Sequence, residues 1–213
     1  MTVREPAAAP EVGLPRFSRR RLVVAGAIGA ALGLAGFRLL SGSGGFRINT
    51  VERPAPDMDA GTYRLTVNGA VERPLTLSLD ALQALPSVRQ VSDFHCVEGW
   101  GVPDVRWEGV RLQSLIESVK PAAEVSHITF HSAGGVYRDS LTLQQAMLPD
   151  VLLAYHMFER PLSRDHGYPL RLVMPRMYGY KGPKWIERVE FVKAREVGYW
   201  SQRGWKVDAW LGS

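Results

Sequence analysis

Cys96 is the single cysteine of this 213-residue sequence, and it is the first residue to weigh for chemistry. One thiol cannot form an internal disulfide, so its value lies in packing, in nucleophilic chemistry or in metal ligation. Residues 88–94, just before it, are typical of a strand. Gly99, Gly101 and Pro103 predict an irregular loop after it. Cys96 is therefore expected where a strand runs into a loop, a position that often carries chemistry.

A second stretch with chemical potential runs from residue 166 to residue 185. It places Arg171, Lys181 and Lys184 on or beside a loop that contains Gly179 and Gly182. Glycines let backbone amides approach a ligand closely, and such a loop with cations suits a phosphate or another polyanion. Charge alone would favour a solvated basic edge. The interleaving of cations with glycine favours a shaped anion site.

The histidines leave one alternative open. No His or Cys spacing predicts a zinc site. His127, His131 and His156 lie in strand-like runs, where a structural role is the expectation. His95 adjoins Cys96 but points to the opposite face of an extended segment, so it is a poor base for that thiol. A hydrolase or thiol transferase that uses Cys96 with another histidine stays open.

The elements that must position these residues mix short helices with strands in no regular alternation. Such a pattern predicts an α+β fold rather than a doubly wound sheet. No Gly-x-Gly-x-x-Gly or Walker pattern follows a strand, so dinucleotide and NTP sites have no support. The hydrophobic patterns and caps predict strands at 63–68, 88–94, 125–130, 151–155, 168–174 and 186–192, and helices at 79–85, 112–119 and 143–147.

Most of the net charge of +5 belongs to the N-terminal segment. Residues 1–43 carry six arginines and two glutamates, a charge of +4, which leaves 20 basic and 19 acidic residues, or +1, for the remainder. The basic balance therefore gives no reason to expect nucleic-acid binding by the folded part. The content of 46% hydrophobic and 22% charged residues is typical of a globular protein.

Residues 1–45 are expected to be a leader with a linker, and residues 46–213 the folded domain. Three arginines at 19–21 precede an apolar run at 22–37 that is rich in Ala and Gly, which is the order of an export signal. Paired arginines before a weakly hydrophobic run resemble a twin-arginine signal, so we expect a periplasmic or other extracytoplasmic protein. The competing interpretation is an uncleaved membrane anchor, because residues 22–40 are long enough to span a bilayer.

Together, the two chemistry-bearing stretches resemble the sulfite oxidase family of molybdopterin-dependent oxidoreductases. Cys96-Val-Glu-Gly-Trp100, followed by Trp-Glu-Gly-Val-Arg-Leu at 107–112, is similar to the family's molybdenum-ligand segment. Residues 166–175 and 178–185 are similar to its pterin-binding segment, in the same order and spacing. The resemblance implies a sulfite-oxidase-type molybdopterin-binding fold with mixed sheets and short helices. It also implies oxygen-atom transfer with a molybdenum-molybdopterin cofactor.

The resemblance assigns roles residue by residue. Cys96 is implied to be the protein ligand of molybdenum, a role that suits a soft thiolate. Arg171 is implied to pair with the cofactor phosphate. His166 stands where many relatives carry Asn to contact the pterin. The other cofactor contacts implied by position are Asn49, Ser132, Lys181, Gly182, Pro183 and Lys184.

The residues after Cys96 favour a substrate other than sulfite. Animal and plant sulfite oxidases have a basic turn there, whereas this chain has Glu98, whose carboxylate would repel an anion. The chain also ends soon after its last predicted strand, without room for the C-terminal dimerisation domain of those enzymes. Both features resemble the monomeric catalytic subunits of bacterial periplasmic protein-methionine-sulfoxide reductases, which receive electrons from a membrane haem protein.

We therefore expect reduction of a sulfoxide-like substrate, either a small molecule or protein-borne. The sequence contains no Cys-x-x-Cys-His motif, so the electrons must be exchanged with a membrane haem protein or another electron-transfer protein. A sulfite-oxidising enzyme of the same family is the alternative within this chemistry.

Overall fold

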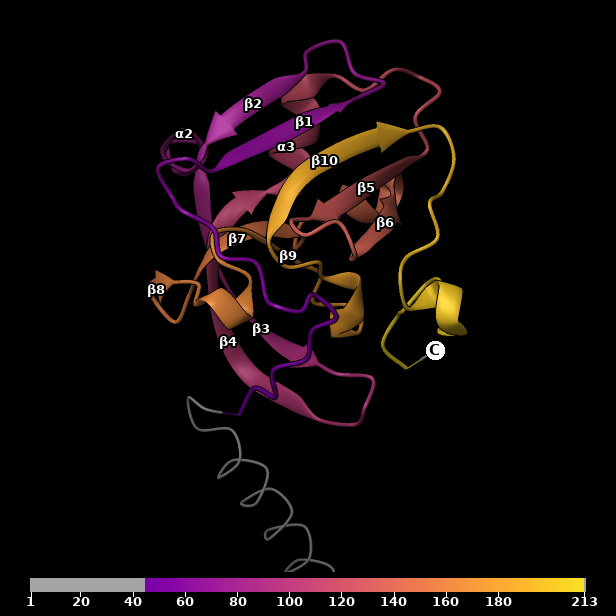
Figure 1. The fold of residues 1–213 in the computed structure, drawn as a ribbon. Helices are drawn as coiled ribbons and strands as arrows, with labels where there is room; N and C mark the ends of the chain where they lie inside the picture. The colour runs from indigo at the N-terminus through magenta and orange to yellow at the C-terminus, as the bar shows by residue number, and fades with distance from the viewer. Residues whose placement is uncertain (1–44, 213) are drawn as a thin grey trace, which may run out of the picture. The chain divides into compact units, whose positions relative to one another are not determined.

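The computed structural model describes residues 45–212, which form an α+β fold of two sheets with short helices (Figure 1). One sheet has the strand order β2-β1-β10-β5-β6, and the other has the order β3-β4-β7-β8, with β9 also paired to β7. The leader with linker expected at residues 1–45 lies outside the described residues, apart from Gly45. The strands are β1 (Arg64–Gly69), β2 (Leu75–Ser78), β3 (Ser87–His95), β4 (Gly101–Arg111), β5 (His127–Ser132), β6 (Arg138–Thr142), β7 (Leu152–Met157), β8 (Arg160–Pro161), β9 (Arg171–Val173) and β10 (Ile186–Val192).

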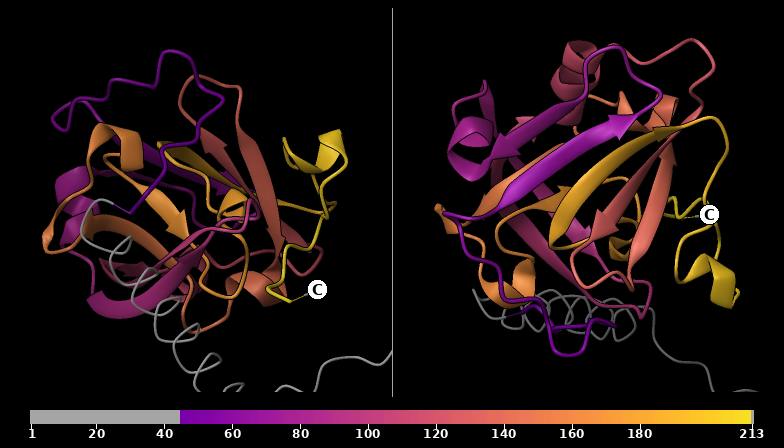
Figure 2. Two further views of the ribbon diagram at one scale, coloured as in Figure 1. Left: turned by 90° about the horizontal axis from the view of Figure 1, so that it is seen from below. Right: turned by 45° about the horizontal axis from the view of Figure 1, so that its top comes forward.

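The first sheet is mixed, because β1 and β10 pair in parallel and its other pairs are antiparallel. Figure 2 shows β1, β10, β5 and β6 side by side as one layer. Alternation along β1 buries Leu65 and Val67 completely while Arg64 faces solvent. The main core forms where this sheet packs with the helices and with β7 and β9. The expected α+β class with mixed sheets is confirmed.

The helices begin where the sequence predicts, but α2 ends two residues and α4 one residue before the predicted end. Ser78 caps α2 (Leu79–Gln83) by accepting the N–H of Ala81, and Thr142 forms a capping box with Gln145 on α4 (Leu143–Ala146). Helix α3 (Leu112–Val119) buries its leucines, Ile116 and Val119 on one face. It stops at Lys120, which takes a left-handed conformation just before a proline. The three 3-10 turns are η1 (Arg164–His166), η2 (Gly179–Lys181) and η3 (Ser201–Arg203).

The prediction of an irregular loop after Cys96 is wrong from Gly101 onward, because β4, the longest strand of the described residues, begins there. Pro103 is tolerated because the pairing of β3 with β4 shifts register between Ser92 and Phe94, and a bulge needs no ladder donor at that point. Asp104, in the same irregularity, has a positive φ, and its N–H donates to the Asp93 carboxylate. The strand predicted at 168–174 shortens to β9, and β2, β6 and β8 were not predicted.

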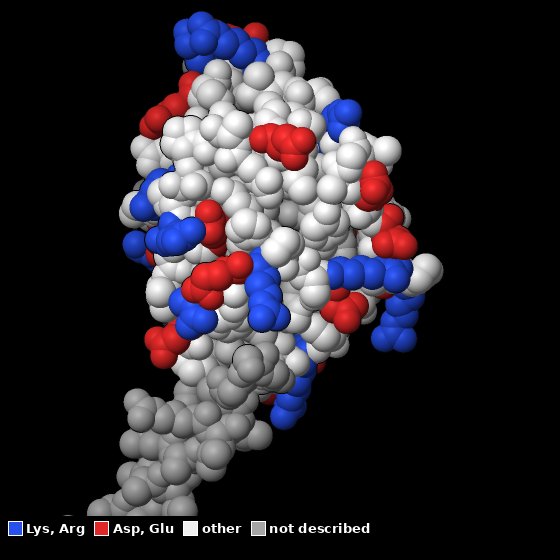
Figure 3. Space-filling model, turned by 90° about the vertical axis from the view of Figure 1, so that its left-hand side faces the viewer, with Lys and Arg blue, Asp and Glu red and all other residues white. Residues whose placement is uncertain are grey.

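The surface of the described residues mixes both signs of charge. On the side shown in Figure 3, Lys and Arg side chains alternate with Asp and Glu and form no broad patch of one sign. Several are paired, such as Arg106 with Glu159 at 2.6 Å between Nε and Oε1. Within residues 45–212, no helix has the length and apolar character needed to cross a bilayer.

Candidate cofactor site

Cys96 lies in the tight turn that joins β3 to β4. Its N–H donates to the Trp100 carbonyl at 2.8 Å, and the N–H of Gly99 donates to the Cys96 carbonyl at 3.1 Å. Gly99 takes a φ of 85°, a conformation that favours glycine and allows the chain to reverse within this turn. The thiol is therefore held on a short loop at the end of a long hairpin, as the sequence predicted for the end of the strand at 88–94.

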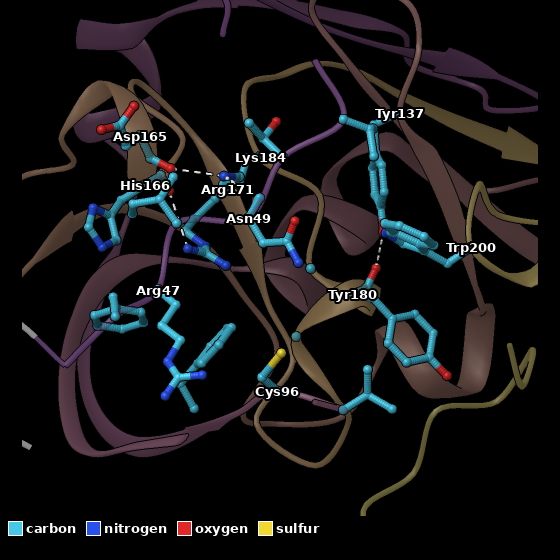
Figure 4. A pocket seen from close by; sticks show the side chains of 18 of the residues that line it. Arg47, Asn49, Cys96, Tyr137, Asp165, His166, Arg171, Tyr180, Lys184 and Trp200 are labelled. Carbon is cyan, nitrogen blue, oxygen red and sulfur yellow. Dashed lines mark hydrogen bonds between the residues drawn. The ribbon is translucent and has the colours of Figure 1, made fainter. Parts of the chain in front are cut away.

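The thiol faces a cavity that encloses about 850 Å³, including its open mouth. Figure 4 shows Cys96 in this cavity, with the cations and His166 on one side of the view and Tyr137, Tyr180 and Trp200 on the other. The expected site residues that line it are Asn49, Cys96, Ser132, His166, Arg171, Gly182 and Lys184.

Arg171 is a buried cation without a carboxylate partner. Its Nη1 donates to the His166 carbonyl at 3.2 Å, while its buried Nε has no hydrogen-bond partner among the described residues. The guanidinium stacks over the Trp107 ring at 5.2 Å. Burial lowers the pKa of Arg171 to about 10, so the side chain remains charged at neutral pH. An unpaired buried cation that lines a cavity is suited to bind an anion.

Lys184 joins the N-terminal segment to the η1 turn. Its Nζ donates to the Asn49 carbonyl at 3.0 Å and to the Asp165 carbonyl at 2.9 Å. Desolvation, followed by the nearby charge of Arg171, lowers the pKa of Lys184 to about 7. No side-chain carboxylate is hydrogen-bonded to this ammonium in residues 45–212, and an anion in the cavity would restore its charge.

Two further polar groups in the cavity wall have no partner. Ser132 Oγ and His166 Nε2 are buried without a hydrogen bond in the described part of the chain. The other ring nitrogen of His166, Nδ1, lies 2.8 Å from the Ser163 hydroxyl. Burial and the cations Arg171 and Lys184 lower the pKa of His166 to about 4, so the ring is neutral at physiological pH. Buried polar groups are normally satisfied, so these atoms would suit a polar ligand bound in the cavity.

Two of the expected contacts do not line the cavity. Lys181 is buried on the other side of its loop, with Nζ 2.5 Å from Asp139 Oδ1 and 2.7 Å from the Ser140 carbonyl. Pro183 is buried, and its carbonyl accepts the N–H of Leu172. Both residues instead fix the backbone around Gly182, which does line the cavity.

Glu98 connects three groups of the site. Its carboxylate accepts from Asn49 Nδ2 at 3.3 Å and from Trp100 Nε1 at 3.2 Å, and it lies 3.8 Å from Cys96 Sγ. Burial is the main cause that raises the pKa of the Cys96 thiol in the protein without a ligand. In residues 45–212 no histidine is hydrogen-bonded to the thiol, so the arrangement does not resemble an activated cysteine nucleophile.

Several cavity residues were missed from the sequence. Arg47 adds an exposed cation from the N-terminal segment, and Tyr137, Tyr180, Trp200 and Trp205 add aromatic rings. Trp200 and Trp205 follow Gly198 and Gly204, and this aromatic and glycine pattern near the end of the chain was a usable signal. Arg47 and Tyr137 carry no local signal, because only the tertiary fold brings them to Cys96.

Comparison with known proteins supports the same interpretation of this cavity. The model of the oxidoreductase molybdopterin binding domain family matches residues 52–200. The sulfane dehydrogenase SoxCD from Paracoccus pantotrophus superposes with a TM-score of 0.61 at 24% identity, over 66% of this chain and 41% of that one. This likeness shows the fold and confirms the expected sulfite-oxidase type.

Three proteins of the same kind are similar to this chain in sequence. An uncharacterised oxidoreductase of Bacillus subtilis, YuiH, is 33% identical over 154 residues, which are 71% of this chain and 77% of that protein. The protein-methionine-sulfoxide reductase catalytic subunit MsrP of Campylobacter jejuni is 31% identical, over 68% of this chain and 54% of its own length. The mitochondrial sulfite oxidase of Rattus norvegicus is 33% identical, over 72% of this chain and 33% of its own length.

The chain thus spans about half of the reductase subunit and a third of the sulfite oxidase. The family model nevertheless covers the cavity's chemistry-bearing residues from Cys96 to Lys184. The chain belongs to the sulfite oxidase family of molybdopterin-binding oxidoreductases.

Proposed function

We propose that this chain is an exported molybdenum enzyme that reduces a neutral, sulfoxide-like substrate. The observation that carries the proposal is that the Cys96 thiol and the unpaired buried cation Arg171 line one cavity. When bound, a molybdenum-molybdopterin cofactor supplies two-electron oxygen-atom transfer. The family membership and the unsatisfied polar atoms of the cavity support this cofactor.

Residues of this chain would bind the cofactor at its phosphate, at its pterin and at the metal. Arg171 and Lys184 would bind its phosphate, and Ser132, His166 and Gly182 would contact the pterin from the cavity wall. Cys96 would supply the protein's thiolate to the metal. Within residues 45–212 no group of three or more His, Cys, Asp or Glu side chains could hold a metal ion, so the other ligands would come from the cofactor.

The carboxylate of Glu98 supports a neutral substrate. It lies 3.8 Å from Cys96 Sγ and is held by two hydrogen bonds, so its charge would be repulsive toward an anion that approaches the metal. Relatives that are sulfoxide reductase subunits support the same direction. The reaction requires two electrons from outside the chain, and we propose a membrane haem protein or another electron-transfer protein as their source.

Sulfite oxidation is the second candidate, and Arg47 favours it. This exposed cation lines the cavity and could attract an anionic substrate to the opening. The match to sulfite oxidases is of similar strength to the match to reductase subunits. A cysteine nucleophile with a histidine has no such support, since Glu98 is the hydrogen-bond partner of the thiol.

Metal analysis and two activity assays test these proposals. The purified full chain should contain close to one molybdenum per molecule, and Cys96→Ser should abolish sulfoxide reduction. The wild type should oxidise reduced viologen with a sulfoxide but should not reduce cytochrome c with sulfite. Sulfite-dependent cytochrome reduction that disappears in Arg47→Ala would favour the second candidate. A wild type without molybdenum, unchanged in any activity by Cys96→Ser, would contradict the cofactor proposal.

Export through the twin-arginine route is the remaining part of the proposal. The paired arginines at positions 19 and 20 and the Ala- and Gly-rich run after them support it. Replacing both arginines with lysine should leave the folded protein in the cytoplasm, as shown by cell fractionation. Unchanged export of that variant would contradict the route without bearing on the cofactor.

A further inference from the structure

The cavity has an aromatic wall, formed by Tyr137, Tyr180, Trp200 and Trp205. In Figure 4, three of these residues, Tyr137, Tyr180 and Trp200, lie on the side away from Arg171 and Lys184. None of the four carries a charge at neutral pH, and burial raises the pKa of Tyr180 to about 12. The end of the cavity formed by the aromatic wall is therefore uncharged, whereas Arg171 and Lys184 lie at the other end, next to the rings of Phe94 and Trp185.

Hydrogen bonds hold the two tyrosines of the aromatic wall in place. The Tyr137 hydroxyl donates to the Tyr180 carbonyl, and the Tyr180 hydroxyl donates to the Lys206 carbonyl at 2.9 Å. Both hydroxyl protons are therefore used within the chain. What these residues offer to a ligand is mainly the apolar surface of their rings.

A tight turn brings the two tryptophans together. The N–H of Trp205 donates to the Trp200 carbonyl at 3.2 Å across η3, and Gly204 permits the reversal with a φ of 95°. The two indoles stack with centroids 4.8 Å apart and planes at 26°. The Tyr180 ring meets the Trp205 ring edge to face at 4.9 Å. Such contacts fix ring positions, so the wall is ordered before a ligand binds.

We propose that the aromatic wall binds the carbon substituents of the substrate and selects sulfoxides with a flat or large apolar substituent. This inference rests on the proposed sulfoxide reduction. The cations would be occupied by the cofactor phosphate, which leaves the uncharged end of the cavity for the substrate. Stacking on an ordered aromatic surface adds to the gain from burying apolar area. A small sulfoxide such as dimethyl sulfoxide cannot use this surface fully.

Reduction of an aryl methyl sulfoxide consumes two electrons and two protons. The sulfur–oxygen bond breaks, the sulfur gains two electrons to become a thioether, and the oxygen leaves as water with two protons from solvent. In the assay, two molecules of reduced viologen, a one-electron dye, supply the electrons. The aromatic wall takes no part in electron or proton transfer, so its contribution is to binding.

Steady-state kinetics with two substrates test the wall. The molybdenum-loaded full chain is assayed by reduced-viologen oxidation with methyl p-tolyl sulfoxide and with dimethyl sulfoxide. The wild type should prefer the aryl substrate in kcat/KM by at least about tenfold, the equivalent of about 1.4 kcal/mol. Trp205→Ala and Trp200→Ala should lose most of that preference through a higher KM for the aryl substrate, with a much smaller change in KM for dimethyl sulfoxide. Trp205→Phe should restore part of it.

A variant outside the aromatic wall serves as the control, and sulfone binding is measured separately from activity. Gln202→Ala, on the exposed side of the same turn, should behave like the wild type. Methyl p-tolyl sulfone, which the reaction does not consume, should quench tryptophan fluorescence of the wild type and bind more weakly to Trp205→Ala. An unchanged preference in both tryptophan variants, or equal losses with both sulfoxides, would overturn the inference alone. A molybdenum-loaded wild type that reduces neither sulfoxide would overturn the proposed function as well.

Discussion

Lys181 Nζ lies 2.5 Å from Asp139 Oδ1, and each side chain is only 2% exposed. The same carboxylate oxygen accepts the N–H of Ser140 at 2.7 Å. Gly198 packs against this carboxylate so closely that a Cβ there would come within 2.3 Å of it. The ion pair therefore ties the loop beside the cavity to strand β6, with Tyr180 and Gly182 on either side of Lys181 lining the cavity.

Breaking this pair should destabilise the fold. Lys181→Met leaves Asp139 buried without its partner, and loss of one member of a buried pair costs about 3–5 kcal/mol. The double variant Lys181→Met with Asp139→Leu should recover most of that loss, since both charges are removed together. Urea denaturation of each variant measures the free energy of unfolding. A single variant as stable as the wild type would show that the pair contributes nothing.

The depressed pKa of Lys184 predicts a pH-dependent stability of the protein without cofactor. A lysine titrates near 10.4 when unfolded and near 7 here, so between these values the unfolded chain binds the additional proton. Stability therefore rises with pH from about 7 to about 10, with a slope of at most about 1.4 kcal/mol per pH unit from this group. Lys184→Met should remove that part of the slope, as measured by urea denaturation across this range.

Lys184→Met should affect stability and cofactor binding in opposite directions. Because the buried ammonium costs stability without an anion, Lys184→Met should be at least as stable as the wild type at pH 7. It should nevertheless retain less molybdopterin, measured by the fluorescence of the released, oxidised pterin. Lys184→Arg, which keeps a cation, is the matched control and should retain more. Full pterin content in Lys184→Met would exclude a phosphate contact for Lys184.

Gly179 should tolerate no side chain. A Cβ there would lie 2.2 Å from Cζ of Phe94, a ring two residues before Cys96. Forcing extra atoms into such a contact costs about 1–3 kcal/mol, so Gly179→Ala should lower the free energy of unfolding and displace the hairpin that carries the thiol. Gly61→Ala is the control, because its Cβ would meet only the end of the Asp59 side chain at 3.2 Å. Equal stability of the two variants would contradict the close packing.

The sequence allowed the cysteine turn to be predicted, because it depends on local residue types. The thiol after a strand, the caps at Ser78 and Thr142, and the hydrophobic face of α3 are local patterns, and the structure contains them. Lys181 could not be distinguished from Lys184 by such patterns. Which of the two faces the cavity depends on Asp139, which lies 42 residues before Lys181.

Strand β4 and the aromatic wall show two further limits. Gly101 and Pro103 are typical of loops, yet the pairing of Gly101 with His95 and of Val102 with Phe94 on β3 makes them part of a strand. Tertiary pairing thus overrides local preference. The wall gathers Tyr137 with Trp200 and Trp205, which come from distant segments, so its position depended on knowing the fold.

His166 should be replaceable by Asn, the residue that many relatives carry there. Burial and two cations lower its pKa to about 4, so at pH 5–8 the ring acts as a neutral hydrogen-bonding group, as an amide does. His166→Asn should keep its molybdopterin, whereas His166→Leu, whose side chain has no polar atoms, should lose it.

The lowered pKa of His166 also predicts a loss of stability in acid. Between pH 6.5 and pH 4 this histidine binds a proton in the unfolded chain but not in the folded protein, so the free energy of unfolding of the wild type falls toward pH 4. The Asn variant should show less of that fall in acid denaturation, and an identical profile would mean that His166 does not contribute to it.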